Sequence, residues 1–370
     1  MGKHASGKHV RIDRTKRLRE EPHTGHNRWH PDIAPIVEVD PGEEVSLETR
    51  DAMDLQIGPR TTVEDLPKLE RTAAHPLTGP VYVKGARPGD LLEIEYLDIV
   101  PERYGWTRFS PGFGFLPDLF DHYFVVHWDI TPEYATSPQL PGVRIPNGAF
   151  MGTAGVAPSR EQLAKWTSRE KALLEKGGRV LPPTSAAAVP SGGKVAEEGL
   201  RTIPPRENCG NADVKHLTRG SKLYVPVAVD GALYSVGDGH YAQGDSECCG
   251  TAIEMGATAV VRFKVYKDEA RAKGITWPRF SHANYENRLE RNFIATMGMP
   301  VTADGRQESC DLNLAARNAV LEMIRLLEER GWTREQAYVL CSVAVDLRVS
   351  NVVDVPNVTV SAFLPESIFV

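Results

Sequence analysis

The sequence has no long uninterrupted run of apolar residues. A transmembrane helix needs about 20 consecutive, mostly apolar residues, and the 370-residue chain contains no such stretch. The basic amino-terminal stretch, MGKHASGKHVRIDRTKR, also lacks the apolar segment that a secretory signal carries. We therefore expect no membrane partner, and we expect residues 1–20 to form a disordered tail.

Cysteine is scarce as well, and the chain has no net positive charge. The five cysteines, Cys209, Cys248, Cys249, Cys310 and Cys341, are an odd set without the spacing of a disulfide framework. This usage is typical of a reducing compartment. The formal net charge is -6, and Lys and Arg form no stripe along the chain, so we expect no nucleic-acid partner. These features predict a cytoplasmic protein.

Several well-known motifs are missing. No HExxH zinc motif occurs, and no Gly-Lys-Ser/Thr follows the small-residue stretch at 145–158. A phosphate-binding loop for a nucleotide cofactor is therefore not expected. Gly148, Gly152 and Gly155 instead predict that the backbone of this stretch closely approaches a ligand or another strand.

The high content of glycine and proline favours many turns and short strands. The sequence has 32 Gly and 27 Pro, with 41% hydrophobic and 25% charged residues, as in ordinary globular proteins. Alternating residues flank a DPG turn at 35–49, which predicts a hairpin, and a PGD turn separates two more predicted strands within 79–101. A helix is predicted after an N-cap at Ser159.

The carboxy-terminal part has a different pattern. Apolar residues recur at helical period in 311–331, which ends at Gly331, and Thr333 is placed to cap a second helix. Further strands close the chain. We predict a mainly β fold, sandwich- or barrel-like, with α/β additions and a C-terminal helix pair.

The predicted organisation is one domain over residues 21–370. Its parts are an N-terminal β part at about 21–158, a linker or lid at 178–206, a catalytic β part at about 207–300, and a helical part with closing strands at 301–370.

The segment Tyr234–Met255, YSVGDGHYAQGDSECCGTAIEM, is the predicted active site. Asp238 and His240 are two residues apart, so on a strand they would share a face. Asp245 and Glu247 repeat that spacing after a glycine turn. Carboxylates held close together raise each other's pKa and cost stability, so this crowding predicts a compensating cation or a catalytic proton.

Asp213, Asp238 and His240 are the predicted metal ligands. One imidazole with carboxylates suits zinc in an open catalytic site, whereas calcium or manganese would suit an all-oxygen subset. His240, Asp245 and Glu247 are the predicted catalytic residues. In this interpretation Glu247 takes a proton from water and passes it to the leaving group.

Other interpretations remain open. Cys248 or Cys249, beside Glu247 and His240, would form a thiol nucleophile with an acid and a base. A non-catalytic β protein that binds small amides or sugars is a second alternative. The cluster HNRWHPD at 26–32 is either a capping loop around Trp29 or a substrate contact. His282 and Glu286 are further candidates for the pocket.

Several long motifs resemble the acetamidase/formamidase family. They are HNRWHPDI at 26–33, GNADVKHLTRGSKLYVPV at 210–227, GDGHYAQGDSECCGTAIE at 237–254 and VVDVPN at 352–357. The first and last of these look closer to the formamidase branch. The resemblance extends over nearly the whole chain.

The resemblance implies hydrolysis of a short-chain amide to a carboxylate and ammonia. It also implies a predominantly β fold with α/β additions, a homo-oligomer and a metal requirement. By position, the pocket would comprise Asn211, Asp213, Asp238, His240, Gln243, Asp245 and Glu247. Asn211 and Gln243 would hold the amide of formamide or a similarly small substrate. Ser246 stands where the family usually has Gly, which restricts the backbone beside Glu247.

Overall fold

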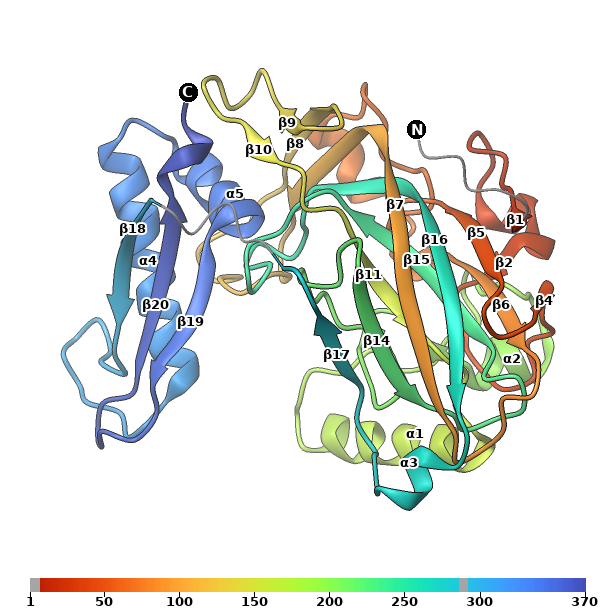
Figure 1. Cartoon of the computed structure of the whole chain (residues 1–370). Helices are drawn as coiled ribbons and strands as arrows, with labels where there is room; N and C mark the ends of the chain where they lie inside the picture. The colour runs from red at the N-terminus through yellow and green to blue at the C-terminus, as the bar shows by residue number, and fades with distance from the viewer. Residues whose placement is uncertain (1–6, 286–291) are drawn as a thin grey trace.

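The protein, described here by a computed structural model over residues 7–285 and 292–370, is built mainly from strands (Figure 1). Within these residues, one branched sheet contains fifteen strands. They are β1 Lys8–Val10, β2 Gly25–His26, β4 Val37–Val39, β5 Glu44–Thr49, β6 Leu77–Val83, β7 Leu91–Phe109, β8 Phe124–Ile130, β9 Tyr134–Thr136, β10 Ile145–Pro146, β11 Phe150–Gly155, β13 Cys209–Asn211, β14 Ser221–Pro226, β15 Tyr234–His240, β16 Glu254–Tyr266 and β17 Arg279–His282. A separate pair consists of β3 Arg28–Trp29 and β12 Leu200–Arg201.

The long strands β7 and β16 form the centre of the large sheet. They pair antiparallel with each other, and β16 also pairs with β5. Leu92, Ile94 and Tyr96 of β7 are fully buried in the core, and the intervening Glu93 is buried as well. The mainly β prediction is confirmed, while the sandwich- or barrel-like arrangement stays a prediction.

The helices are α1 Arg160–Glu175, α2 Gly193–Glu198, α3 Glu269–Ala272, α4 Leu312–Glu329 and α5 Arg334–Ala344. The helix pair α4 and α5 lies with a three-stranded sheet at the left of Figure 1. That sheet has the order β18 (Phe293–Gly298), β20 (Thr359–Pro365), β19 (Asp346–Asn351). The C-terminal helix pair is confirmed.

Both predicted N-caps are confirmed. The Ser159 side chain accepts a hydrogen bond from Gln162 N, and Thr333 accepts one from Gln336 N. These caps satisfy backbone N–H groups that the first helical turn leaves without partners. One hydrophobic core contains buried residues of α4, α5 and the large sheet together, so the helices are packed into the same interior as the strands.

The predicted disordered tail is wrong for the described residues 7–20. β1 pairs in parallel with β5, and the buried Leu18 donates its backbone N–H to Asp54 Oδ1 at 2.7 Å. Backbone pairing with a strand far along the sequence holds this charged segment, and composition does not reveal such pairing.

Residues 178–206 are not a free linker. They contain α2 and β12, and the side chains of Asn27 and Arg28 hold their carbonyl oxygens. Asn27 Nδ2 donates to Ala187 O at 2.8 Å, and Arg28 Nη2 donates to Ala186 O at 2.8 Å. The hairpin predicted at 35–49 is also wrong, because β4 pairs with β6 while β5 pairs with β1 and β16.

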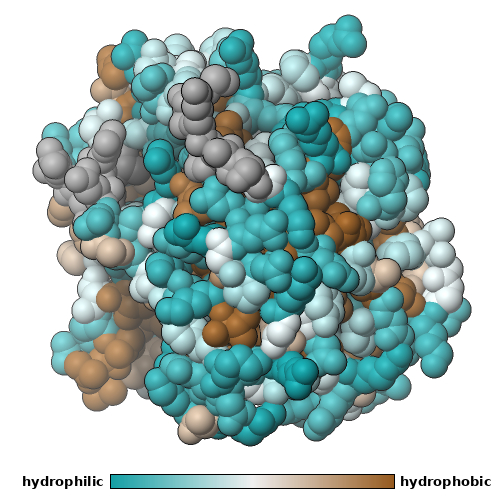
Figure 2. Space-filling view, turned by 45° about the vertical axis from the view of Figure 1, so that its right-hand side comes forward, coloured by the Kyte–Doolittle hydropathy of each residue, from teal (hydrophilic) through white to brown (hydrophobic). Residues whose placement is uncertain are grey.

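The face of the molecule in Figure 2 is mostly hydrophilic, with separate hydrophobic patches, a broad one at the lower left. In the carboxy-terminal part, Phe293, Met297, Val349, Val353 and Val355 are exposed apolar side chains. Across the described ranges, none of the helices combines the length and the apolar character that crossing a membrane requires.

Candidate active site

A glycine on β11 makes room for the acidic segment. β15 carries Asp238 and His240 and pairs antiparallel with β11, which contains Gly152. A Cβ atom at Gly152 would lie 2.6 Å from Asp213 Oδ1 and 2.8 Å from Asp238 Oδ2. A side chain at this position would therefore displace both carboxylates. The predicted close approach of this stretch is confirmed at Gly152.

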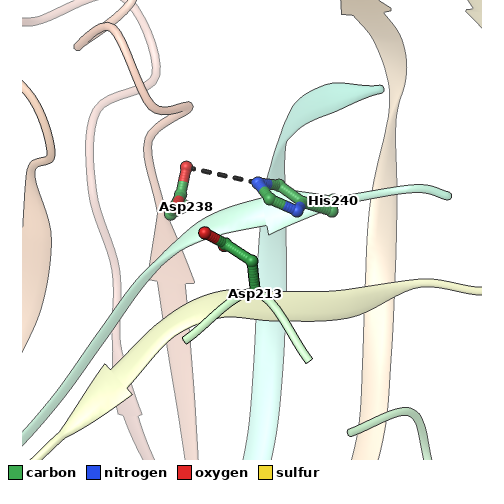
Figure 3. A group of neighbouring side chains, drawn as sticks. All are labelled: Asp213, Asp238 and His240. Carbon is green, nitrogen blue, oxygen red and sulfur yellow. Dashed lines mark ion pairs between the residues drawn. The ribbon is translucent and has the colours of Figure 1, made fainter. Parts of the chain in front are cut away.

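Asp213, Asp238 and His240 converge on one point (Figure 3). Asp213 comes from the loop after β13, where its φ of 48° turns the chain back toward β15. Asp238 Oδ1 lies 3.5 Å from His240 Nε2, and both side chains are buried. The predicted metal-ligand triad is thus brought together.

Hydrogen bonds fix the two aspartates. The Thr153 hydroxyl lies 3.1 Å from Asp238 Oδ2 and also within reach of Asn211 Oδ1. Asn211 Nδ2 donates to Asp213 Oδ2 at 3.0 Å. His75 Nδ1 lies 3.3 Å from Asp238 Oδ2. One oxygen of each carboxylate is therefore held, which leaves the other directed at the centre of the cluster.

Gln243 sets the orientation of His240. Its Oε1 atom lies 2.9 Å from His240 Nδ1, and its Nε2 atom donates to Asp213 O at 2.9 Å. Because the glutamine nitrogen is engaged elsewhere, its oxygen must accept the Nδ1 proton of the imidazole. His240 Nε2 then faces Asp238 and Glu254, whose Oε2 atom is 3.2 Å away. That nitrogen needs either a proton or a cation between it and the carboxylates.

Two acids of the cluster hold protons unusually well. A third, Asp238, does not: burial would raise its pKa, but the nearby His75 and His240 outweigh burial and lower it. Burial raises the pKa of Asp213 and of Glu247 well above the carboxyl range, and neighbouring carboxylates raise both further. Burial alone would lower the pKa of His240, but Glu254 and Asp238 outweigh it and raise that pKa well above its usual value. Burial and the crowding of carboxylates around one imidazole thus make the fully ionised cluster unfavourable.

Four atoms of the cluster have no hydrogen-bond partner within the described part of the chain. They are Asp213 Oδ1, Asp238 Oδ1, His240 Nε2 and Glu254 Oε2, all buried. An unsatisfied buried polar group costs about 1–3 kcal/mol. The ligand atoms of Asp213, Asp238 and His240, and those of His240, Glu247 and Glu254, lie within 4.8 Å of one another. These donor sets fit a small divalent cation.

A cavity of about 210 Å³ opens beside the cluster. Its acidic wall contains Asn211, Asp213, Asp238, Glu247 and Glu254. The remaining lining consists of apolar, polar and basic side chains, among them Ala52, Met53, His75, Trp106, Phe113, Leu181, Ile203, Thr251, Arg71, Arg108 and Arg201. The predicted residues Glu247 and Asn211 therefore reach a space that can hold a small molecule.

The structure separates Asp245 from this cluster. Its carboxylate lies 3.8 Å from Lys215 Nζ, and its backbone N–H donates to Asp346 Oδ1 at 3.0 Å. The two-residue spacing fails here because the chain leaves the strand after His240, with φ of 121° at Ser246 and 50° at Glu247. Asp245 and Glu247 consequently do not share a face.

Gln243 is also placed differently from the prediction. It contacts His240 and the backbone of Asp213, and it is not part of the cavity wall. In this structure Gln243 orients the imidazole of His240.

Sequence reasoning missed the roles of Glu254 and His75. Glu254 belongs to the predicted segment, and its signal is that β16 pairs it directly with His240. His75 and Thr153 arrive from other strands and loops, so no local pattern connects them with Asp238.

None of the remaining candidates that the structure describes lines the cavity. Burial raises the pKa of Cys249 to about 11 and that of Cys248 well above the thiol range, and neither thiol lines the cavity. Trp29 is buried in a small apolar cluster, which favours the capping interpretation of its loop. His282 Nε2 lies 3.1 Å from Arg219 O, and Glu286 lies outside the described residues.

The family model of the acetamidase/formamidase family matches residues 11–370. The chain belongs to the acetamidase/formamidase family. It is accordingly an amide hydrolase of that type. The glycine-spaced acids, the buried imidazole and the adjoining cavity are thus the candidate active site of such a hydrolase.

Named relatives support the assignment over the whole length. An acetamidase of Mycolicibacterium smegmatis is 37% identical over 89% of this chain and 87% of its own. A formamidase of Methylophilus methylotrophus is 36% identical over 97% of this chain and 93% of its own. Among solved structures, a gamma lactamase from Delftia acidovorans superposes with a TM-score of 0.93 at 35% identity, covering 98% of this chain and 93% of that one.

Proposed function

We propose that this protein hydrolyses formamide or another short-chain linear amide to a carboxylate and ammonia with the help of a divalent metal. The observation that carries the proposal is the group of orphaned buried atoms of Asp213, Asp238, His240 and Glu254 beside a cavity. Buried carboxylate oxygens and an imidazole nitrogen without hydrogen-bond partners are costly unless a cation or a moving proton resides among them.

Zinc is the metal we favour, with Asp213, Asp238 and His240 as its ligands. A mixed set of one nitrogen and several oxygens suits a catalytic zinc site, and the second set, with Glu247 and Glu254, offers oxygens that calcium or manganese would prefer. A metal bound there supplies Lewis acidity, which lowers the pKa of water and polarises a carbonyl.

The residues around it have separable roles. Glu247 takes a proton from the attacking water and returns it to the departing nitrogen, a task that suits its raised pKa. Asn211 gives one amide hydrogen to Asp213 and has a second for the substrate. Gln243 keeps the imidazole of His240 turned toward the acids.

Glu247→Gln tests the proposal. We expect the variant to retain substrate binding while kcat for ammonia release falls by about 100- to 10,000-fold, because glutamine cannot transfer the proton. Ammonia release and equilibrium binding of the same amide are the measurements. Asp245→Asn is the matched control, since that carboxylate lies outside the cluster, and its kcat should stay near the wild-type value.

Two results would contradict the proposal. One is wild-type turnover by Glu247→Gln. The other is a wild-type protein that binds amides but releases no ammonia, as the alternative of a non-catalytic amide- or sugar-binding β protein requires.

We extend the proposal to the assembly and the compartment. A homo-oligomer would cover exposed apolar side chains of the carboxy-terminal part, such as Met297, Val353 and Val355. All five cysteines are free thiols, which supports a cytoplasmic location. We also keep the proposal that the branched fifteen-stranded sheet is sandwich- or barrel-like.

A further inference from the structure

The cavity has a basic wall as well as an acidic one. Arg71, Arg108 and Arg201 line it together with the acids of the cluster. Arg108 belongs to β7 and Arg201 to β12, while Arg71 precedes β6. No local sequence pattern places these three residues together, so the basic wall is a product of the fold.

Arg108 is a buried cation without a counter-ion. Arg108 is only 7% exposed, and its guanidinium group makes no ion pair with any described residue. Its Nη1 atom donates to Ser110 Oγ at 2.9 Å, its Nη2 atom lies 3.5 Å from Met53 Sδ, and its Nε atom has no partner. Burial lowers the pKa of Arg108 to about 10, so it still carries its charge at neutral pH.

Arg201 is likewise buried and forms no ion pair with a described residue. The residue is 6% exposed, and its Nη2 atom donates only to backbone oxygens, at 3.0 Å for Arg71 O and 3.5 Å for Ala74 O. Its Nε atom is buried without a partner. The neighbouring Arg28 adds positive charge, since β12 and β3 pair Arg201 with Arg28. Arg71 is exposed at the cavity, where it can attract anions from solvent.

A buried guanidinium without a counter-ion is unfavourable, and a carboxylate is its best complement. The planar fork of Arg matches two carboxylate oxygens. The acids of the cluster do not fill this role, because they lie beyond ion-pair distance of Arg108 and Arg201 within the described residues. An anion brought by a ligand would satisfy the free Nε–H groups.

We propose that the substrate is an amide that itself carries a carboxylate, such as the monoamide of a short dicarboxylic acid. The amide group lies at the acidic wall, and the carboxylate lies at Arg108 and Arg201. This inference rests on the proposed amide hydrolysis and names its substrate class. Water adds to the amide carbon, the C–N bond breaks, ammonia leaves, and the product is the dicarboxylate.

The size of the cavity agrees with this substrate class. Its volume is about 210 Å³, whereas about 10–15 Å³ of such space is enough to hold one water molecule. Formamide, with a single carbon, would leave most of that space unfilled. Met53 and Trp106 line the cavity and offer apolar contact to a short methylene chain between the two polar ends.

A matched pair of substrates tests the proposal. Malonamate and malonamide have nearly the same shape and differ in a carboxylate against a neutral amide. We expect wild-type protein to show a higher kcat/KM for malonamate. Arg108→Gln should lower the ratio of the two kcat/KM values by about 10- to 100-fold, the effect of losing hydrogen bonds to a charged group. Arg201→Gln should lower the same ratio.

Arg206→Gln is the control for the loss of a buried arginine. Arg206 is 5% exposed, is paired with Glu170 and lies outside this cavity, so its substitution should leave the substrate ratio unchanged. Because the readout is a ratio within one protein sample, partial misfolding does not mimic the effect.

The inference would be overturned if the wild-type kcat/KM for malonamate were equal to or below that for malonamide. It would also be overturned if Arg108→Gln and the wild type had the same ratio of these two values. If formamide is hydrolysed and malonamate is not, the substrate class is wrong while the proposed function stands. If no amide of either kind is hydrolysed, both are wrong.

Discussion

At the scale of single residues, the spacing of the cluster depends on Gly152. An added methyl group would overlap Asp213 Oδ1, Asp238 Oδ2 and the ring of His240. We predict that Gly152→Ala lowers kcat/KM for amide hydrolysis by about 100-fold or more, because misplacing reacting groups by about 1 Å has that effect. Ammonia release and metal content are the measurements.

Gly148→Ala is the matched control. Gly148 lies in the same stretch, but a Cβ atom there would meet nothing within 4 Å. The activity and metal content of the Gly148→Ala variant should equal those of the wild type. Equal activity of the two alanine variants would show that the cluster does not need its close packing against β11.

Ser246 has a backbone conformation that is unusual for a residue with a side chain. Its φ of 121° lies in a region that favours glycine, and the sequence comparison with the family marked this position as the one where glycine is replaced. The resulting backbone strain lies directly beside Glu247. The sequence thus predicted the constrained residue, although it did not reveal that the same turn carries Asp245 away from the cluster.

At the scale of elements, α5 holds the loop that carries Glu247. Tyr338 OH donates to Cys248 O at 2.5 Å and accepts hydrogen bonds from Phe115 N at 3.1 Å and Leu116 N at 3.0 Å. Ser342 Oγ accepts from Cys249 N at 3.1 Å. The helix therefore acts as a fixed support for the segment after His240.

Tyr338→Phe should weaken both stability and catalysis. Removal of the hydroxyl leaves buried backbone groups without partners, which we expect to lower the free energy of unfolding by about 1–3 kcal/mol. Because the freed segment follows Glu247, kcat should fall as well. Chemical denaturation and ammonia release measure the two effects.

Thr333→Ala separates these effects. It removes the N-cap of the same helix, at a cost of about 1 kcal/mol, but it touches no atom of the 243–251 loop. We expect lower stability with an unchanged kcat. A kcat lowered equally in both variants would mean that α5 contributes stability alone.

The elements that the sequence predicted well are those fixed by interactions between residues close together in the chain. Ser159 and Thr333 cap α1 and α5 through residues three positions away, so a short window contains the whole signal. The hairpin at 35–49 failed because each of its strands pairs with distant segments. Residues 8–10 were misjudged for the same reason, since their partner is β5. The linker interpretation of residues 178–206 failed likewise, because Asn27 and Arg28 hold their backbone, while the lid interpretation stays a prediction.

At the scale of the whole molecule, the site combines residues of one continuous segment with residues that only the fold brings to it. The spacing of Asp238, His240 and Glu247 indicated a segment that reaches the wall of the cavity. His75 and Arg108 come from elsewhere in the chain and meet that segment only in the folded sheet. Their roles depend on long-range strand pairing, which a single sequence does not specify.

The central claim is that a bound cation makes the buried acid cluster a hydrolytic centre. The most direct measurement is ammonia release from formamide, with metal content determined on the same samples, before chelation, after chelation and after zinc is restored. The account predicts that activity falls in proportion to the metal removed and returns with zinc. Undiminished activity in protein from which all metal has been removed would contradict it.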